Sequence, residues 1–233
     1  MQKHFDEVEH IIKSNNFDVF CLSETWLHDK IENEIIEIDG YMLFRKDRTN
    51  KRGGGVAIYV RNDFQVKPQV NLNNSSIEAL WVNIKLKSIG QVLISCMYRE
   101  PNANDDYYDD MLDNIECALS HNENIIILGD LNYDYKIDEN LCRNPLFYIE
   151  SLYGLKQLID SPTRVTVNSS TTLDVILTSI PEFHKSSGVI PVTVSDHYLV
   201  YTDLIFNAPE QKHQSVRFRD YKNFNAGEFN SSL

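Results

Sequence analysis

The chain has 233 residues, of which 42% are apolar, and its 22 basic and 34 acidic side chains give a net charge of −12. This apolar content is sufficient for a folded core and excludes a disordered chain, while the longest aliphatic run, at 125–128, is far shorter than the roughly 18 residues of a membrane span. The acidic balance argues against attraction of the whole surface to nucleic acid or anionic membranes, although a local basic patch is compatible with it.

Apolar positions at helical spacing predict a helix at the start of the chain, near residues 3–14. Apolar runs predict strands at 17–23, 41–44, 55–60, 78–86 and 92–99. Helical spacing returns at 108–119, a buried strand follows at 124–130, and 145–154 forms a short helix between Pro and Gly. Three last strands are predicted at 173–179, 188–194 and 199–206. Nine or ten strands with about three helices indicate an α/β fold of two packed β-sheets with helices outside.

The chain divides near Asn207. Residues 1–206 hold all the predicted elements and are interpreted as one domain, whereas 207–233 are polar, contain Pro209 and are interpreted as a linker. The N-terminus lacks the apolar segment of a secretory signal. The cysteines are widely spaced without a CxxC pair, so we expect buried thiols of an intracellular protein; they are Cys21, Cys96, Cys117 and Cys142.

Polar residues that can bind a metal or take part in catalysis stand at the ends of predicted strands, where a sheet fixes the backbone and a loop exposes the side chain. They are Glu24, Asp130, Asn132, Asp174, Asp196 and His197. Asp130 and Asn132 are two residues apart, so in extended chain they share a face. A histidine beside an aspartate can bind metal or act in acid–base chemistry.

Each motif alone also has an ordinary structural interpretation. GDLN, at 129–132, is compatible with a simple turn after a strand. SDH, at 195–197, is compatible with a capped surface histidine, and Glu24 with the start of a helix. The whole set, in this order and on strand ends, is much more specific than any of its members.

Eight stretches, in order and covering nearly the whole chain, resemble the endonuclease/exonuclease/phosphatase superfamily and, within it, the apurinic-type endonuclease domain of non-LTR retrotransposons. They are LSETWL (22–27), GYMLFRKDR (40–48), RGGGVAIYV (52–60), MYREP (97–101), ILGDLN (127–132), SPTRVT (161–166), TLDVILTS (172–179) and VSDHYLV (194–200). The resemblance implies a four-layer sandwich, with two central sheets covered by helices. It also implies Mg²⁺-dependent cleavage of DNA, which leaves a 3′-hydroxyl to prime reverse transcription.

The same resemblance implies roles for the matching residues. Glu24 is similar to the principal metal ligand and Asp196 to a second carboxylate on the metal side. Asp130 is similar to the group that orients or deprotonates the attacking water, with Asn132 supporting it. These roles agree with the preference of a hard cation for carboxylate oxygens, which stabilises charge on a phosphodiester under attack.

On the other side of the phosphate, the resemblance implies a histidine contact. His197 is similar to the histidine that touches the scissile phosphate, and Asp174 to the carboxylate that orients it. Tyr98 is similar to a tyrosine that contacts the phosphate, and Thr163 is a weaker match to a phosphate-contacting threonine. A hydrogen-bonding imidazole at this position would add electrostatic stabilisation.

DNA contact must be local in so acidic a chain. The best candidate is the basic run at 45–52, interpreted either as a backbone clamp on phosphates or as a solvated hairpin loop. The candidate contacts are Arg45, Arg48 and Arg99. The two tryptophans, Trp26 and Trp81, are interpreted as core side chains rather than as base-stacking platforms.

The sequence departs from the family at its start. Family members begin with a strand that carries an asparagine near the metal, and this strand precedes the first helix. Here Met1 already stands at the helix, so the chain is interpreted as truncated or as lacking an upstream segment. We expect one sheet to lack that strand and to expose an edge.

Three hypotheses about function follow. The first is an endonuclease domain that uses Mg²⁺, with Mn²⁺ as an alternative, to nick DNA within a larger reverse-transcriptase polyprotein. Its chromosomal substrate implies the nucleus, and no membrane contact is expected. The second is a phosphatase or phospholipid phosphodiesterase of the same superfamily. The third is a catalytically inactive remnant that only folds or binds.

Overall fold

A computed structural model describes residues 1–104, 106–135 and 144–206. Within these ranges, two sheets dominate. The larger has the strand order β4-β5-β6-β7-β11-β8, formed by β4 (Gln65–Pro68), β5 (Glu78–Leu86), β6 (Gly90–Tyr98), β7 (Ile125–Asp130), β11 (Asp174–Thr178) and β8 (Lys156–Gln157). The smaller has the order β1-β3-β2, formed by β1 (Val19–Ser23), β3 (Val56–Arg61) and β2 (Tyr41–Lys46).

Two short β-ribbons and the helices complete the fold. The ribbons pair β9 (Arg164–Val165) with β10 (Ser170–Thr171), and β12 (His184–Ile190) with β13 (Leu199–Leu204). The helices are α1 (Phe5–Asn15), α2 (Val70–Asn73), α3 (Asp106–His121) and α4 (Pro145–Tyr153), with 3₁₀ turns η1 (Gln2–His4), η2 (Asn33–Ile36) and η4 (Pro181–Phe183). None of the described helices combines the length and apolar character needed to cross a bilayer.

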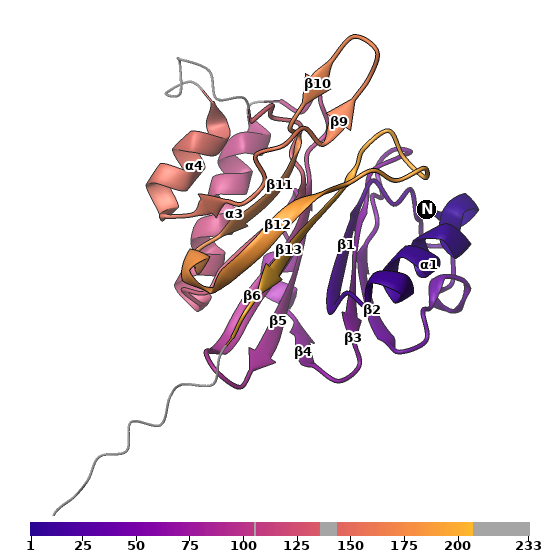
Figure 1. Cartoon of the computed structure of the whole chain (residues 1–233), viewed down its shortest axis with the longest axis horizontal. Helices are drawn as coiled ribbons and strands as arrows, with labels where there is room; N and C mark the ends of the chain where they lie inside the picture. The colour runs from indigo at the N-terminus through magenta and orange to yellow at the C-terminus, as the bar shows by residue number, and fades with distance from the viewer. Residues whose placement is uncertain (105, 136–143, 207–233) are drawn as a thin grey trace, which may run out of the picture.

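The elements stack in four layers (Figure 1): α3 and α4, then the six-stranded sheet, then the three-stranded sheet, then α1. The two sheets meet through a fully or nearly fully buried apolar layer, which includes Ile58 of β3 and Val82 of β5. Burying one such side chain stabilises the fold by roughly 1.5–3 kcal/mol. The predicted α/β sandwich of packed sheets with flanking helices is therefore confirmed.

Each helix layer follows from the sequence pattern that predicted it. Val8 and Ile12 of α1 pack on the outer face of the small sheet, whereas Met111 and Ile115 of α3 pack on the large one. Trp81 is fully buried beneath α3, as predicted. Its indole N–H donates to Asn114 Oδ1 at 2.7 Å, which satisfies a polar group that would otherwise be costly to bury.

The predicted elements differ from the observed ones mainly near the C-terminal end. The strand predicted at 188–194 instead spans His184–Ile190, and it ends before Pro191, which has no N–H to donate to a ladder. Asp196 and His197 therefore lie in the loop between β12 and β13 and do not directly follow a strand. The short strands β4, β8, β9 and β10 were not predicted, because they contain too few residues for a pattern.

The cysteine predictions are partly correct. Cys96 is buried, Cys21 is half-buried and Cys117 is exposed, so the expectation of a buried thiol is wrong for Cys117. All three are free thiols. Cys142 and the predicted linker at 207–233 lie outside the described residues.

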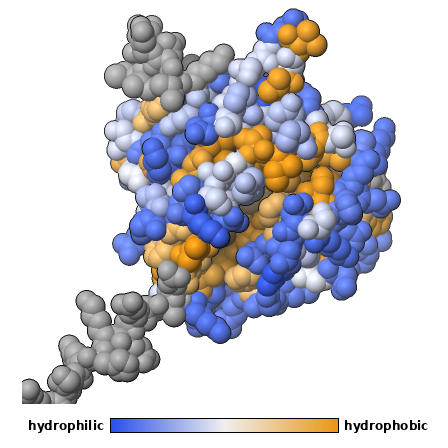
Figure 2. Space-filling view, in the orientation of Figure 1, coloured by the Kyte–Doolittle hydropathy of each residue, from blue (hydrophilic) through white to orange (hydrophobic). Residues whose placement is uncertain are grey.

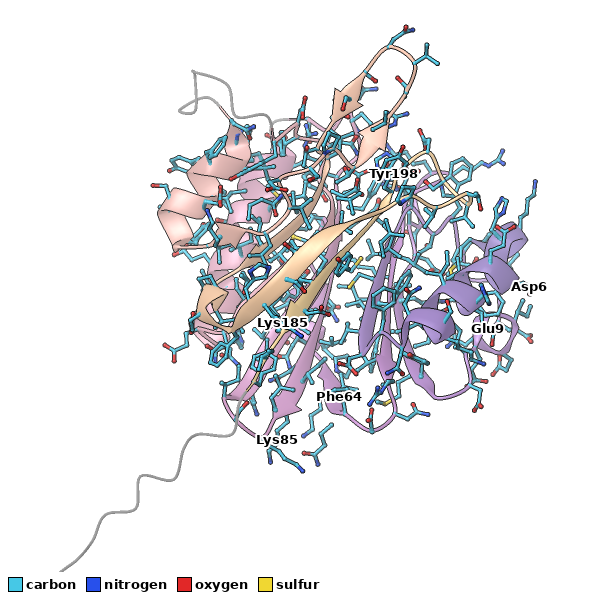
Figure 3. The ribbon with its side chains drawn as sticks, viewed as in Figure 1. Asp6, Glu9, Phe64, Lys85, Lys185 and Tyr198 are labelled. Carbon is cyan, nitrogen blue, oxygen red and sulfur yellow. The ribbon has the colours of Figure 1, made fainter. Side chains whose placement is uncertain are left out.

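An apolar groove of about 490 Å³ separates β1 from β13. Among the described strands, β1 pairs only with β3 and β13 only with β12, so each presents one edge without a strand partner. Figure 2 shows apolar side chains in the hollow between the two halves of the molecule. The groove lining includes Phe64, in the lower part of the view in Figure 3, and Tyr198, in its upper part. Asp174 and His197 also line it.

Candidate active site

One row of cross-strand neighbours brings three of the predicted residues together. Tyr98, the last residue of β6, is the register partner of Asp130, the last residue of β7. Asp130 is in turn the partner of Asp174, the first residue of β11. Register partners on adjacent strands place their side chains on the same face of a sheet. Residues far apart in the sequence therefore stand side by side at one end of the large sheet.

A glycine makes this row possible. Gly129 has φ +139°, and a Cβ atom on it would lie 1.9 Å from the carbonyl oxygen of Met97 on β6. No other residue type fits so close an approach of two backbones. The glycine of the GDLN motif is thus required by packing, and it fixes the direction from which Asp130 enters the site.

Asp130 is almost completely buried, with 6% of its surface exposed. Burial, and after it the negative charge of Asp174, raises the pKa of Asp130 to about 7. Asn132 donates to both of its carboxylate oxygens, from the backbone N–H at 3.0 Å and from Nδ2 at 3.1 Å. Asp130 is therefore a carboxylate that changes charge near neutral pH, in a fixed orientation.

Asn132 is a positioning residue for this carboxylate. It adopts φ +50°, a left-handed conformation that asparagine tolerates better than most residues. Its Nδ2 also donates to the backbone carbonyl of Arg99 at 2.8 Å. The side chain thus ties the segment after β7 to the segment after β6, the two strands that carry Asp130 and Tyr98.

His197 enters the site from the loop between β12 and β13. Its Nδ1 lies 2.9 Å from Asp174 Oδ2 and 3.9 Å from Asp130 Oδ2. Burial lowers the pKa of His197, but the hydrogen bond to Asp174 and the neighbouring carboxylates outweigh it, so the net shift is upward. Because Nδ1 is engaged by Asp174, Nε2 is the nitrogen that remains for a substrate.

Thr163 holds the Asp174 end of the site from inside. Its side chain is fully buried, and Oγ1 accepts hydrogen bonds from the backbone N–H groups of Leu173 at 3.0 Å and Asp174 at 3.1 Å. Its carbonyl oxygen accepts from Tyr198 N–H at 2.7 Å, next to His197. In this structure Thr163 is a buried positioning residue, and its contact with a phosphate stays a prediction.

We expect Thr163→Val to lower the free energy of unfolding by about 1–3 kcal/mol, because it leaves two buried N–H groups without an acceptor while keeping the shape of the side chain. Thr163→Ser retains the hydroxyl and should lose less. Urea denaturation of the two variants and the wild type measures the difference. A serine variant less stable than the valine variant would instead assign the effect to the packing of the methyl group.

Glu24 approaches the row from the other sheet. It directly follows β1 with φ +52°, and its Oε1 accepts a hydrogen bond from the Tyr98 hydroxyl. Burial, and then this hydrogen bond to Glu24, raises the pKa of Tyr98. The contact joins the two sheets at the same end as Asp130 and keeps an exposed carboxylate beside the buried ones.

Asp196 is placed differently from its predicted partners. Its Oδ2 accepts from Arg164 Nε at 2.8 Å and lies 2.7 Å from the second guanidinium nitrogen, and 61% of its side chain is exposed. The hydrogen bond to Arg164 lowers the pKa of Asp196. The structure therefore shows Asp196 in a surface ion pair, and its role as a metal ligand stays a prediction.

The three basic candidates are already partnered within the protein. Arg45 donates to the Ile31 carbonyl at 2.7 Å and lies 3.3 Å from Asp47. Arg48 pairs with Glu78 and Glu100, and its guanidinium carbon lies 5.8 Å from the centre of the Tyr98 ring. Arg99 is 9% exposed, and its guanidinium carbon lies 4.1 Å from the centre of the Tyr133 ring. Their contact with phosphates stays a prediction.

Glu78 was missed by the sequence reasoning, although it belongs to the same row. It is the register partner of Tyr98, and it accepts from Arg48 and from Gly55 N–H. Glu78 is the first residue of β5 and belongs to none of the motifs that marked the other candidates. The available signal is a lone acidic residue at the start of a mostly apolar strand.

Asp130, Asp174 and His197 form a candidate metal site, because one ligand atom from each lies within 4.8 Å of the others. Two buried neighbouring carboxylates repel each other, and a cation would offset that repulsion. Oxygen donors suit Mg²⁺. The donor set thus fits a divalent cation, and Glu24 stands near enough to Asp130 to raise its pKa by charge.

Comparisons with known proteins identify the family and the fold. The sequence profile of the endonuclease/exonuclease/phosphatase family matches residues 1–197. A comparison with curated protein sequences finds no match. Among solved structures, the chain is similar to the endonuclease domain of TRAS1, a telomere-specific non-LTR retrotransposon, with TM-score 0.66 and 18% identity over 86% of this chain and 91% of that one.

Two further structures share the fold. The AP endonuclease LMAP from Leishmania major matches with TM-score 0.70 and 15% identity, over 86% of this chain and 82% of that one. The 3′ phosphatase NExo from Neisseria, bound to a product DNA hairpin, matches with TM-score 0.64 and 14% identity, over 87% of this chain and 94% of that one.

Proposed function

This chain belongs to the endonuclease/exonuclease/phosphatase family, and we propose that it is a metal-dependent endonuclease that nicks DNA to leave a 3′-hydroxyl for reverse transcription. The observation that carries the proposal is the group formed by the buried Asp130 and Asp174 with the half-buried His197. It combines a carboxylate that titrates near pH 7 with an oriented imidazole, which are the two parts that hydrolysis of a phosphodiester needs.

The residues divide the work by position. In its ionised form, which a neighbouring cation would favour, Asp130 accepts the proton of the attacking water. His197 offers Nε2 to a non-bridging phosphate oxygen and stabilises the charge that develops there. Asp174 fixes the orientation of the ring, while Asn132 holds Asp130. Tyr98 carries its hydroxyl to the edge of the same site.

A divalent cation belongs to this proposal, and Mg²⁺ is the cation that the oxygen donors favour, with Mn²⁺ as an alternative. When bound, it would polarise the phosphate and stabilise the leaving oxygen. Asp130, Asp174 and Glu24 are the residues that would hold it, and Mg²⁺ needs only one or two carboxylates because it keeps several waters. Asp196 as a further ligand would require it to leave Arg164.

DNA as the substrate is supported by the neighbours in structure, one of which is a retrotransposon endonuclease and another of which is bound to DNA. We further propose that the chain acts within a larger reverse-transcriptase polyprotein and reaches its substrate in the nucleus. With a net charge of −12, binding must rest on local contacts, and the slope of its salt dependence measures how many phosphates they neutralise.

The direct test incubates the purified chain with supercoiled plasmid at low salt, with Mg²⁺ or with EDTA. Conversion to nicked circles only with Mg²⁺, at ends that a DNA polymerase can extend, supports the proposal. Release of phosphate from inositol phosphates or from 3′-phosphorylated DNA, without nicking, would favour the phosphatase alternative. Neither activity, together with no heat of Mg²⁺ or Mn²⁺ binding in calorimetry, would indicate an inactive remnant.

A further inference from the structure

Trp26 lies on the surface, which corrects the interpretation of this residue as a core side chain. Half of it is exposed, at 50%, whereas Trp81 is fully buried. A large aromatic side chain left half in water loses part of the stabilisation that burial would give. Its exposure therefore needs an explanation beyond the stability of the fold.

The loop that carries Trp26 is fixed by backbone contacts. Trp26 has φ +56°, a conformation that non-glycine residues adopt only where the surroundings hold them. Its N–H donates to the Gly54 carbonyl at 2.9 Å, and Thr25 N–H donates to the Gly55 carbonyl at 3.1 Å. The Thr25 side chain is buried. The indole is thus presented outwards by a fixed backbone.

Arg52 extends the aromatic surface. Its guanidinium carbon lies 5.3 Å from the centre of the Trp26 ring, within the range of a cation–π contact. Arg48 and Lys51, in the same segment, pair with acidic side chains. Arg52 appears in none of the ion pairs described for the structure, so its charge is available to an anion from outside.

The platform of Trp26 and Arg52 stands beside the candidate active site. Trp26 is two residues after Glu24, whose carboxylate accepts a hydrogen bond from the Tyr98 hydroxyl. Tyr98 is the register partner of Asp130. Gly54, which accepts the Trp26 N–H, is packed against Arg48. A nucleic acid with its scissile phosphate at His197 would therefore contact the platform of Trp26 and Arg52 close to the bond that is cleaved.

We propose that Trp26 and Arg52 form a stacking platform for an unpaired nucleobase next to the scissile bond. The indole face away from Arg52 takes the base, and the guanidinium takes the adjacent phosphate. This inference rests on the proposed nuclease function and adds a preference to it: DNA with an unstacked base beside the cut is bound more tightly than fully paired DNA.

Binding is tested without catalysis, by the fluorescence of Trp26 in EDTA. The full chain is titrated with octadeoxyadenylate and with an octamer of the same phosphates that lacks bases. We expect the bases to quench the emission and the abasic octamer to leave it nearly unchanged. Trp26→Phe removes the reporter and leaves the buried Trp81, so its signal should not respond. Equal responses to both octamers, or none to either, would overturn the platform.

Cleavage gives a second readout, with Mg²⁺ and a duplex that has one unpaired adenine at the cut. Trp26→Ala should raise KM about tenfold, as expected for the loss of one stacked base, and change kcat by less than about twofold. Trp26→Phe should restore most of the KM. Tyr148→Ala, which removes another exposed aromatic residue, is the matched control.

The two readouts separate failure of the platform from failure of the function. A wild-type chain that nicks plasmid, together with a Trp26→Ala variant of unchanged KM, would overturn the platform and leave the nuclease standing. Retained quenching by octadeoxyadenylate in a chain that cleaves neither plasmid nor bulged duplex would remove the nuclease function and leave a base-binding surface.

Discussion

Replacing Asp130 by Asn is expected to slow plasmid nicking by about 10²–10⁴-fold, and at the same time to stabilise the metal-free protein at pH 7.5. The loss of activity follows because an amide cannot accept the proton of the attacking water. The gain in stability follows because the wild-type carboxylate is 6% exposed and lies beside Asp174, so its charge is costly to bury. This cost outweighs the one hydrogen bond from Asn132 that an amide gives up, about 0.5–1.5 kcal/mol.

The sign of the stability change comes from the raised pKa. In the unfolded chain Asp130 loses its proton near its ordinary value of 3.8, whereas in the folded chain it keeps the proton up to about pH 7. The folded state therefore binds more protons between these values, and stability falls as pH rises through that window. A shift of this size corresponds to a few kcal/mol at most, on the order of 1.4 kcal/mol per unit.

The measurement is urea denaturation in EDTA at pH 5 and 7.5. Asp130→Asn should gain on the wild type as pH rises, and Mg²⁺ should stabilise the wild type more than the variant. Asp109→Asn, which changes an exposed carboxylate of α3, controls for the loss of one negative charge. A variant that nicks normally would show that Asp130 is not the base, and a constant stability difference would show that burial does not perturb it.

Replacing His197 by Ala is expected to reduce nicking by about 10²–10³-fold with little effect on the fold. The imidazole is part of a loop, its ring is partly exposed, and its main partner is Asp174. Its removal deletes the donor to the phosphate and leaves the strands that build the core unchanged. The effect should fall on kcat, because charge on the phosphate oxygens develops in the transition state.

Asp174→Asn tests how the ring is held. Asp174 is the partner that raises the pKa of His197. We therefore expect His197 to lose its proton at a higher pH in the wild type than in this variant, and the pH profile of the nicking rate to shift accordingly. Rates of nicking from pH 5.5 to 9 give both profiles. His10→Ala, at an exposed position on α1, is the matched control and should nick at the wild-type rate. Activity retained by His197→Ala would remove the histidine from the mechanism.

Much of the sandwich could be predicted from the sequence because its strands are long and apolar. The strand predicted at 78–86 agrees with β5 residue for residue, and the helix at 108–119 lies within α3. Strand ends also indicated where polar groups gather. Pairing register, however, is not written in local pattern, so the direct opposition of Asp130 and Asp174 could be known only from the structure.

Side-chain partners were the least predictable part of the candidate site. A basic run looks like a phosphate clamp in the sequence, yet Glu78 and Glu100, distant along the chain, pair with Arg48. Arg164 captures Asp196 in the same way. Trp26 was misplaced because apolar character suggests burial, whereas its exposure depends on a left-handed backbone that a single sequence does not reveal.

The channel between β1 and β13 gives the molecule an unusual liability. Among the described strands, β1 and β13 border this apolar groove, and each has one edge of backbone amide and carbonyl groups without a strand partner, at which an extended segment can pair. A segment lodged there would lie along the route to Asp174 and His197, which border the same opening. Pairing of an added strand and access to the candidate active site therefore involve the same stretch of surface.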